Sequence, residues 1–245
     1  MAELWRQYRL ERRMFWRNPS AAFFNFGLPL FFLALFGAIF HNNQHDLDVI
    51  VPGIASMAVM STTFSALAFN ITFLREKGIL KRIRGTPLPS GSYLCGLALN
   101  AVTNTAVQIA IVVVAGRLLF HLGWPQDVLE LLVFVVAGVI CFASLGVALS
   151  HAIPNFDSAP AYVNFIFLPV IMISGVFYDV KNVPSFVRDI ASALPLKHLI
   201  DGLNGALVSG HGLGDHLTAL GVIALWAVPG TLLAIRGFSW EQQRG

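Results

Sequence analysis

The chain has 245 residues, of which 56% are hydrophobic and 12% charged, and its mean hydropathy is +0.70. Soluble domains usually carry about 25% charged residues, so this composition excludes an ordinary water-soluble globular protein. The formal net charge of +3 is small. Apolar runs recur at the length of about 20 residues that crosses a hydrocarbon core. The sequence therefore predicts a single all-α domain over residues 1–245, embedded almost entirely in a membrane.

The first segment, residues 1–20, predicts an amphipathic helix that lies in the membrane interface. Over residues 3–17 its arginines gather on one side of a helical wheel and its aromatic residues on the other, with Arg12 breaking the apolar side. We expect the aromatic side to face lipid and the arginines to face anionic headgroups. Such a helix serves as an anchor, as a lever against a partner, or as both. The two sides consist of Arg6, Arg9, Arg13 and Arg17, and of Leu4, Trp5, Tyr8, Phe15 and Trp16.

Six apolar runs follow, and each predicts a membrane-spanning helix. The first run is too long for a signal peptide and is interpreted as a retained span. We find no internal repeat, which argues against an inverted-repeat transporter. The predicted spans cover residues 21–40, 50–74, 92–120, 128–150, 160–178 and 217–236.

Positive charge is distributed unevenly along the chain. Twelve of the 16 Lys and Arg residues lie in the N-terminal segment, in the loop 75–91 and in the C-terminal tail. Cytoplasmic loops of membrane proteins are enriched in Lys and Arg, so both termini and the loop 75–91 are predicted to be cytoplasmic, in the cell membrane. The opposite side receives Arg117, Lys181, Arg188 and Lys197.

The loop 75–91 is the densest group of charges in the chain. Its apolar residues Ile79, Leu80 and Ile83 share one face of a short helix, because they lie at i, i+1 and i+4. A short basic amphipathic helix between two spans is well placed to contact a cytoplasmic partner. The five cations around this face are Arg75, Lys77, Lys81, Arg82 and Arg84.

Uncharged polar residues recur on single faces of the predicted spans, every seven residues from Ser56 in the second span and every four from Asn100 to Gln108 in the third. One interpretation is hydrogen bonding between helices. The other is a weakly polar pathway with aromatic contact area, which suits an amphiphile or a hydrophobic drug better than an ion. Both interpretations stay open. The candidate pathway residues are Thr63, Phe64, Phe69, Asn70, Asn100, Asn104, Asn164 and Phe165.

Two energy sources are missing from the sequence. No carboxylate falls in the middle of a predicted span, whereas proton- or sodium-coupled carriers usually need one. No G-x-x-x-x-G-K-S/T phosphate-binding loop is present, so the chain is not its own nucleotide-driven motor. The energy for any transport would therefore enter through contact with another protein.

Two further patterns have a plain and a chemical interpretation. His41, His45 and Asp46 would suit a metal ion if their loop were helical, but a solvated loop is favoured and no metal is predicted. Ser174 and His198 would suit an intramembrane serine protease, but a Ser-Gly pair in a span more often packs or ends a helix.

The long connection 179–216 is polar and ends in several glycines. Two patches, 186–196 and 199–208, are too short to span. They predict short helices that enter the outer leaflet, where a re-entrant backbone is tolerated only under a cover of protein or water.

Several motifs of the chain, in their order and spacing, match a known family. The first loop reads Arg75-Glu76-Lys77-Gly78 and then Arg84-Gly85-Thr86-Pro87-Leu88, and the segment before the last span contains Pro169, Ser174-Gly175-Val176-Phe177, Pro184 and Leu194-Pro195-Leu196-Lys197-His198. In these features the chain resembles the membrane subunits of the type-2 ATP-binding-cassette (ABC) permease family, particularly the short bacterial members of drug and antibiotic export systems. Where many relatives carry a proline after the Ser-Gly-x-x-Phe stretch, this chain has Tyr178-Asp179.

The resemblance implies partners. Two permease subunits, identical or different, would pair, and each would dock on a cytoplasmic ATPase that binds ATP and Mg, so that this chain itself binds no cofactor. Nucleic acid is not an expected partner, and membrane lipids are. The helix of the first loop would sit in a cleft of the ATPase. The coupling residues implied are Arg75, Glu76, Lys77, Gly78, Ile79, Leu80, Arg82 and Ile83.

The function expected from this resemblance is outward transport of a hydrophobic or amphiphilic compound by alternating access. The alternatives are export of a lipid-linked glycan or lipid, an intramembrane enzyme, and a non-transporting scaffold that binds an ATPase.

Overall fold

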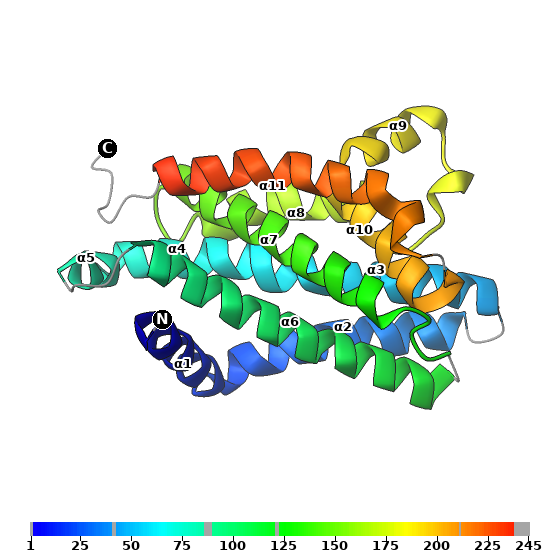
Figure 1. Cartoon of the computed structure of the whole chain (residues 1–245), viewed down its shortest axis with the longest axis horizontal. Helices are drawn as coiled ribbons and strands as arrows, with labels where there is room; N and C mark the ends of the chain where they lie inside the picture. Colours follow the sequence, from blue (N-terminus) through cyan, green and yellow to red (C-terminus); the bar gives the residue numbers. More distant parts are fainter. Residues whose placement is uncertain (1, 41–42, 86–89, 121–122, 211, 238–245) are drawn as a thin grey trace.

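The computed structural model describes residues 2–40, 43–85, 90–120, 123–210 and 212–237, and within these ranges it contains helices and no strand (Figure 1). His41, the motif residues Thr86-Pro87-Leu88 and Arg244 lie outside the described residues. The longer helices are α1 (Ala2–Trp16), α2 (Pro19–Ile39), α3 (Gln44–Met60), α4 (Ala66–Glu76), α6 (Ser90–Phe120), α7 (Val128–Ala152), α8 (Ala159–Ile173) and α11 (Leu217–Gly237). The shorter ones are α5 (Ile79–Arg84), α9 (Ser185–Ala193) and α10 (Pro195–Asn204).

Each of the six predicted spans is helical in the structure. Within the described ranges, four helical segments are long and apolar enough to cross a membrane, namely His45–Glu76, Cys95–Phe120, Val128–Ala152 and Leu213–Arg236. Two further apolar stretches, Asn25–Ile39 and Ala159–Ile173, are shorter. The all-helical membrane class is confirmed, and the count of six spans stays a prediction.

The second predicted span is the centre of the bundle. It forms one continuous rod in which α3 passes through a π-helical turn, Ser61–Ser65, into α4. Every residue from 51 to 60 is buried. The rod packs against α7, and α7 in turn packs along α11 and α10. A hydrophobic core that includes Met60, Phe64, Phe134 and Phe142 fills the space between them.

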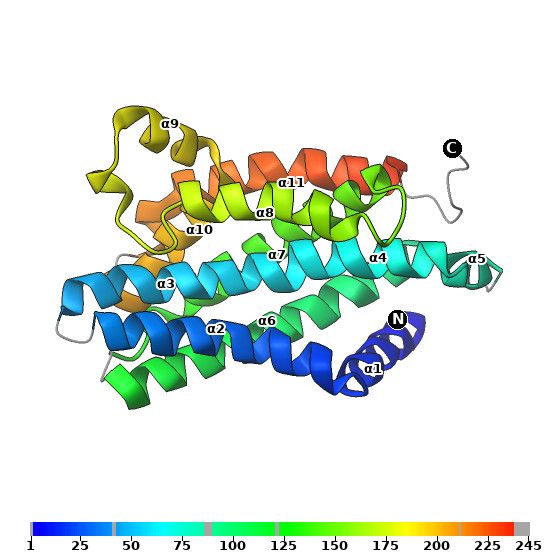
Figure 2. The same cartoon turned by 180° about the vertical axis from the view of Figure 1, so that it is seen from behind.

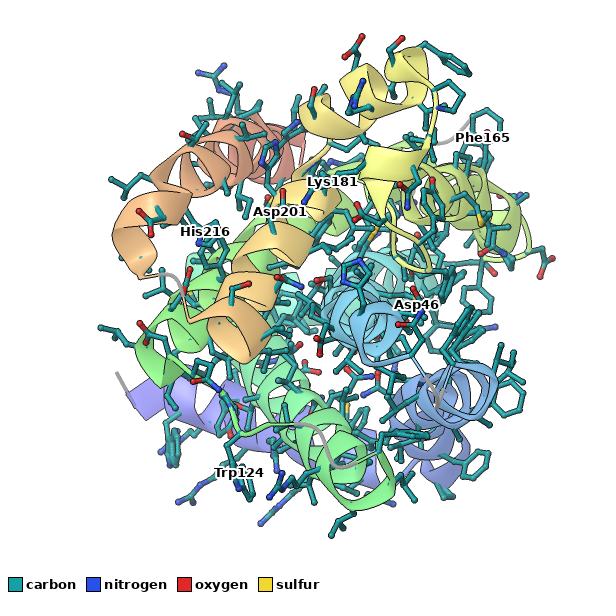
Figure 3. The ribbon with its side chains drawn as sticks, turned by 90° about the vertical axis from the view of Figure 1, so that its right-hand side faces the viewer. Asp46, Trp124, Phe165, Lys181, Asp201 and His216 are labelled. Carbon is teal, nitrogen blue, oxygen red and sulfur yellow. The ribbon has the colours of Figure 1, made fainter. Side chains whose placement is uncertain are left out.

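The basic segments gather at one end of the bundle. Figure 1 shows the start of α1, helix α5 and the end of α11 at one end, and α9 and α10 at the other. Figure 3 views that second end and places Lys181 and Asp201 there. The Lys and Arg residues that are clustered along the sequence are therefore also concentrated at one end of the bundle.

The fifth predicted span ends earlier than expected. Helix α8 stops at Ile173 instead of continuing to residue 178, because Gly175 adopts a φ of 79°, a left-handed conformation that only glycine adopts at no cost. The chain then forms a 3-10 turn, Val180–Asn182, followed by α9 and α10. Helix α10 is buried through Leu196, Leu199 and Leu203. The two short helices predicted here are present, while their entry into the outer leaflet stays a prediction.

Helix α1 carries a buried polar pair that the wheel pattern did not identify, and its orientation in the membrane interface stays a prediction. Its polar residues Gln7 and Glu11 are buried, whereas Trp5 and Trp16 are exposed. Figure 2 shows α1 at the same end of the bundle as α5. α1 packs on α6, and the hydroxyl groups of Tyr8 and Thr103 lie 3.3 Å apart across this contact. The helical wheel correctly grouped the arginines on one side, and all of them except Arg12 are exposed. The side of α1 that faces the protein carries the carboxyl of Glu11 and the amide of Gln7.

Candidate functional site

A cavity of about 520 Å³ lies between α1, α2, the α3–α4 rod and α6. Its most frequent polar lining residue is asparagine, so we call it the asparagine cavity. The five asparagines come from the turn between α1 and α2, from the start of α2, from α4 and from α6. They are Asn18, Asn25, Asn70, Asn100 and Asn104.

Several of these amides have hydrogen-bonding capacity that the protein does not use. Oδ1 of Asn100 and Nδ2 of Asn25 are buried without a hydrogen-bond partner. Asn104 is 3% exposed, and its Oδ1 accepts a 3.5 Å hydrogen bond from Arg12. Buried amide groups are nearly always satisfied by protein or by ordered water. The cavity therefore presents polar groups that suit water or a polar ligand group.

The third-span pattern of Asn100, Asn104 and Gln108 divides into two roles. Gln108 is fully buried, its Nε2 donates to the backbone carbonyl of Asn25, and its Oε1 accepts a 2.6 Å hydrogen bond from Thr62. Gln108 thus joins three helices, as the packing interpretation expected. Asn100 and Asn104 line the cavity instead, closer to the basic loop.

The remaining predicted pathway residues do not converge on the cavity. Phe64 is buried in the hydrophobic core, Phe69 packs against it, and the hydroxyl of Thr63 donates to the carbonyl of Val59 within its own helix. Asn164 and Phe165 lie exposed on α8, and Figure 3 shows Phe165 at the rim of the bundle. Of the eight residues, Asn70, Asn100 and Asn104 are brought together.

One cavity residue, Glu11, was missed at the sequence level. Its side chain is 4% exposed, and Gln7, one turn earlier, donates a 2.8 Å hydrogen bond to its Oε1. Burial raises the pKa of this carboxyl to about 7, and the hydrogen bond from Gln7 opposes the rise. The available signal was the i, i+4 pair of an amide and a carboxyl on the face opposite the arginines.

The basic loop begins with two polar contacts to the loop after α7. Nη2 of Arg75 donates to the carbonyl of Ile153 at 2.6 Å, and Oε2 of Glu76 accepts from the backbone N–H of Phe156 at 2.5 Å. The ring of Phe156 also packs edge-on against Phe73, at 5.3 Å between centroids. We call these contacts the α4–α7 clasp. Arg75, which was predicted to face a partner, is buried inside the clasp.

Helix α5 follows directly after a sharp turn. Gly78 has a φ of 67°, which lets the chain reverse between α4 and α5. Ile79, Leu80 and Ile83 do share one face, as predicted, but this face packs on the chain's own cluster around Tyr93. Leu80 is 0% exposed, so the expectation that it lies free for a partner is wrong. Among the described side chains of this segment, the exposed charged ones are Lys77, Lys81 and Arg82.

The asparagine cavity and α5 are in direct contact. Ile79 from α5 and Leu74 from the last turns of α4 belong to the cavity lining. Any movement of α5 against the bundle therefore changes the shape of the cavity.

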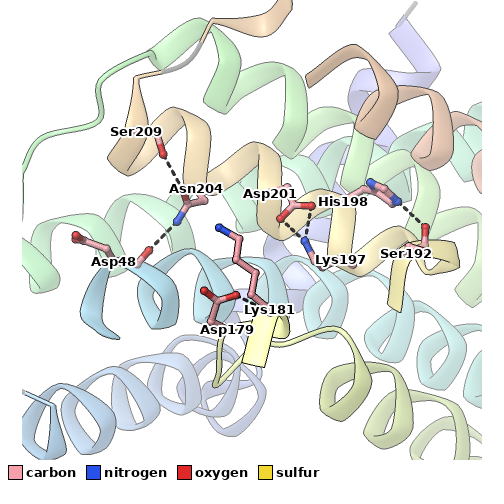
Figure 4. A network of polar contacts seen from close by, with 9 residues as sticks. All are labelled: Asp48, Asp179, Lys181, Ser192, Lys197, His198, Asp201, Asn204 and Ser209. Atoms are coloured by element: carbon pink, nitrogen blue, oxygen red, sulfur yellow. Dashed lines mark hydrogen bonds and ion pairs between the residues drawn. The ribbon is translucent and has the colours of Figure 1, made fainter. Parts of the chain in front are cut away.

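A second polar cavity of about 510 Å³ lies at the opposite end, beneath α9 and α10 (Figure 4). Lys197 and Asp201 form an ion pair there, and Nδ2 of Asn204 donates to the carbonyl of Asp48 at 2.8 Å. Nε2 of His198 lies 2.7 Å from the carbonyl oxygen of Ser192. The buried hydroxyl of Ser174 has no hydrogen-bond partner, so Ser174 and His198 do not form the hydrogen-bonded pair that an intramembrane protease requires.

Known proteins are similar to this chain in sequence. Residues 2–208 match the ABC-2 type transporter family. Nodulation protein J of Sinorhizobium fredii (strain NBRC 101917 / NGR234) is 26% identical over 175 residues, which cover 70% of this chain and 66% of that protein. The daunorubicin resistance ABC transporter permease protein DrrB1 of Streptomyces coeruleorubidus is 28% identical over 183 residues, covering 70% of this chain and 62% of that protein.

A third relative is the linearmycin resistance permease protein LnrN of Bacillus subtilis (strain 168), 22% identical over 175 residues, which cover 71% of this chain and 45% of the relative. The matches to the first relatives thus span slightly less than two thirds of the length of those proteins. The family match covers more than half of the chain. With its helical bundle and apolar spans, the chain belongs to the ABC-2 type transporter family.

Proposed function

We propose that this chain is the permease subunit of an ABC exporter that moves a hydrophobic or amphiphilic compound outward through the cell membrane. In this proposal the chain spans the membrane six times with both termini in the cytoplasm, and ATP hydrolysis occurs on a separate ATPase that binds ATP and Mg. The drug-resistance permeases among its relatives support the direction of transport and the class of substrate.

The observation that carries the proposal is the contact between α5 and the asparagine cavity. Ile79 and Leu74 line the cavity, and the exposed residues Lys81 and Arg82 lie on the same short helix as Ile79. An ATPase that pulls on the exposed face of α5 would thereby reshape the cavity. The α4–α7 clasp extends the same movement to α7 and α8, because Arg75 and Glu76 hold the loop between them.

In this proposal, exposed charged side chains of the basic loop make the contact with the ATPase. Lys77, Lys81 and Arg82 are exposed at the end of the bundle that carries both described terminal helices (Figure 1). Leu80 contributes indirectly, since its burial fixes α5 to the bundle. Charged residues at the rim of an interface govern the encounter and its specificity. Two copies of the ATPase, one for each permease subunit, complete the assembly in this proposal.

Helix α8 supplies the surface for a second permease subunit. It exposes Phe165 (81%) together with the amide of Asn164. A polar amide on a lipid-facing helix is costly, and such residues often hydrogen-bond across helix–helix contacts. Pairing through this face would cover Asn164 in either a homodimer or a heterodimer.

Export of a lipid-linked glycan or lipid is the second candidate. Five asparagine amides in one cavity are also suited to the hydroxyl groups of a sugar. The test measures ATP-driven uptake into inverted vesicles of two substrates, a fluorescent amphiphile and a fluorescent lipid-linked disaccharide. The substrate that is taken up discriminates between export of an amphiphilic compound and export of a lipid-linked glycan.

The coupling part of the proposal is tested by charge reversal. The double variant Lys81→Glu/Arg82→Glu should weaken binding of the ATPase on the order of tenfold and abolish ATP-driven uptake. The control is Lys181→Glu/Arg188→Glu, which makes the same charge change at the opposite end of the bundle. Uptake by the first variant at the control's rate would refute the assignment of α5 as the coupling helix.

A further inference from the structure

The asparagine cavity contains a single acidic side chain. Glu11 lines it, and the described residues of the lining include no Lys, Arg or His. Arg12, the next residue in the chain, directs its Nη1 to Oδ1 of Asn104. The only hydrogen bond that Glu11 receives from the described residues comes from the neutral amide of Gln7.

Among the described residues, no cationic side chain forms a hydrogen bond or ion pair with Glu11; Lys77 lies over the ring of Phe73 instead. From α6 the facing titratable group is the buried phenol of Tyr93. The region between α1 and α2 contributes the amides of Asn18 and Asn25, and α4 and α5 contribute the apolar Leu74 and Ile79. A buried carboxylate without a counter-ion is costly, and the cost is relieved by a proton or by a ligand cation.

The rest of the lining suits the body of such a ligand. Phe15 provides aromatic surface, which attracts cations as well as apolar groups, whereas the ring of Phe73 already has the ammonium group of Lys77 at 5.9 Å from its centroid. The asparagine oxygens, Oδ1 of Asn100 in particular, carry a partial negative charge that favours a nearby cation. Resting on the proposed export function, we propose that the asparagine cavity binds the cationic end of an amphiphile, an alkylammonium group, with Glu11 as its counter-ion.

Two matched probes test the proposal on the complex of permease and ATPase in detergent micelles. One is a fluorescent alkyl chain ending in trimethylammonium, and the other ends in the neutral carbon isostere, tert-butyl. Glu11→Gln, which keeps the size of the side chain, should weaken binding of the cationic probe on the order of tenfold and change binding of the neutral probe less than about twofold. The charge-matched control is Asp157→Asn, on an exposed residue outside the cavity lining.

A pH series on the unmodified protein provides a second measurement that does not depend on the variant. Because the pKa of Glu11 is about 7, protons compete with the cation for this carboxylate below pH 7. The ratio of the affinity for the cationic probe to the affinity for the neutral probe should therefore fall toward one as the pH is lowered. A ratio that stays constant across this range overturns the proposal. An unchanged preference for the cationic probe in Glu11→Gln, or equal losses for both probes, also overturns it.

The cationic group has two possible sources, a soluble amphiphile or an amine-bearing lipid. Nanodiscs of phosphatidylglycerol alone, compared with nanodiscs that contain phosphatidylethanolamine, separate them. Displacement of the cationic probe by phosphatidylethanolamine identifies a lipid ammonium group, and undiminished binding identifies a soluble ligand. ATP-driven uptake of the neutral probe is measured in parallel, so that a failure of the cation site is distinguishable from a failure of the export function.

Discussion

Arg75 and Ile153 lie 78 residues apart in sequence, and the guanidinium of the first donates a 2.6 Å hydrogen bond to the backbone carbonyl of the second. This contact closes the α4–α7 clasp at the end of the bundle that carries α5. It ties the basic loop to the loop between α7 and α8, so the two loops move together.

Replacing Arg75 with Met should destabilise the subunit because the buried Ile153 carbonyl loses its donor. The loss of a charged hydrogen bond costs about 1–3 kcal/mol. For a chain of this size each kcal/mol lowers the thermal midpoint by roughly 2–4 °C, as measured by the thermal unfolding of purified protein in detergent. The exposed Arg82→Met serves as the control. Equal midpoints for the two variants would contradict the structural role of the clasp.

Leu80→Ala should be among the more destabilising single changes in the basic loop. Its side chain is fully buried against Tyr93 and Leu97, and truncating such a leucine costs about 2–5 kcal/mol. The neighbouring Lys81→Ala, on the exposed side of α5, should change stability by less than about 0.5 kcal/mol. Limited proteolysis at Lys and Arg within residues 77–84 reports the loosening of α5 directly. A Leu80→Ala protein as resistant as Lys81→Ala would mean that α5 is not held by this contact.

The helices of this fold could be predicted from the sequence because hydropathy and period are local properties. Six apolar runs gave six helical segments, and Ile79, Leu80 and Ile83 do share one face. Periodicity does not specify the neighbour of that face. Whether it packs on a partner or on the chain's own Tyr93 depends on the path of α6, which is a tertiary property.

The candidate site was less accessible to sequence reasoning for the same reason. Asn70, Asn100 and Asn104 were identified as polar residues in apolar helices, and the structure brings them together. Asn164 gave the same signal and faces outward. Glu11 was hidden among arginines, because the usual expectation for an interfacial helix places its polar residues toward water. Its burial follows from the packing of α1 on α6.

The orientation in the membrane can be measured by cysteine labelling. Cys95 and Cys141 are first replaced with Ala, and single cysteines are then introduced by Arg82→Cys or His45→Cys, both at exposed positions. In intact cells a membrane-impermeant maleimide should label position 45, and it should label position 82 only after the membrane is permeabilised. The reverse pattern would overturn the predicted topology.

The stability of the subunit should depend on pH through Glu11. The folded state raises the pKa of this carboxyl from 4.5 to about 7, so between these values the folded state binds more protons than the unfolded state. The free energy of unfolding should therefore fall by at most about 3 kcal/mol as the pH rises from 4.5 to 7, and it should level off above pH 7. Thermal midpoints measured over this range should lose most of this dependence in Glu11→Gln. The same pH slope in the variant and in the unmodified protein would assign the effect to another group.

The last prediction concerns the close approach of α7 to the α3–α4 rod. A Cβ atom on Gly146 would lie 2.4 Å from the backbone carbonyl oxygen of Phe64, inside any permitted contact distance, whereas one on Gly221 of α11 would meet nothing within 4 Å. Because the neighbour of Gly146 is backbone and cannot rotate away, Gly146→Ala forces the two helices apart at the π-helical turn. We expect a loss of about 1–3 kcal/mol or more, measured as thermal unfolding in detergent. Gly221→Ala makes the same change in helix propensity and should be neutral or stabilising by up to about 1 kcal/mol. Equal stabilities of the two variants would show that α7 and the rod are farther apart than the structure places them.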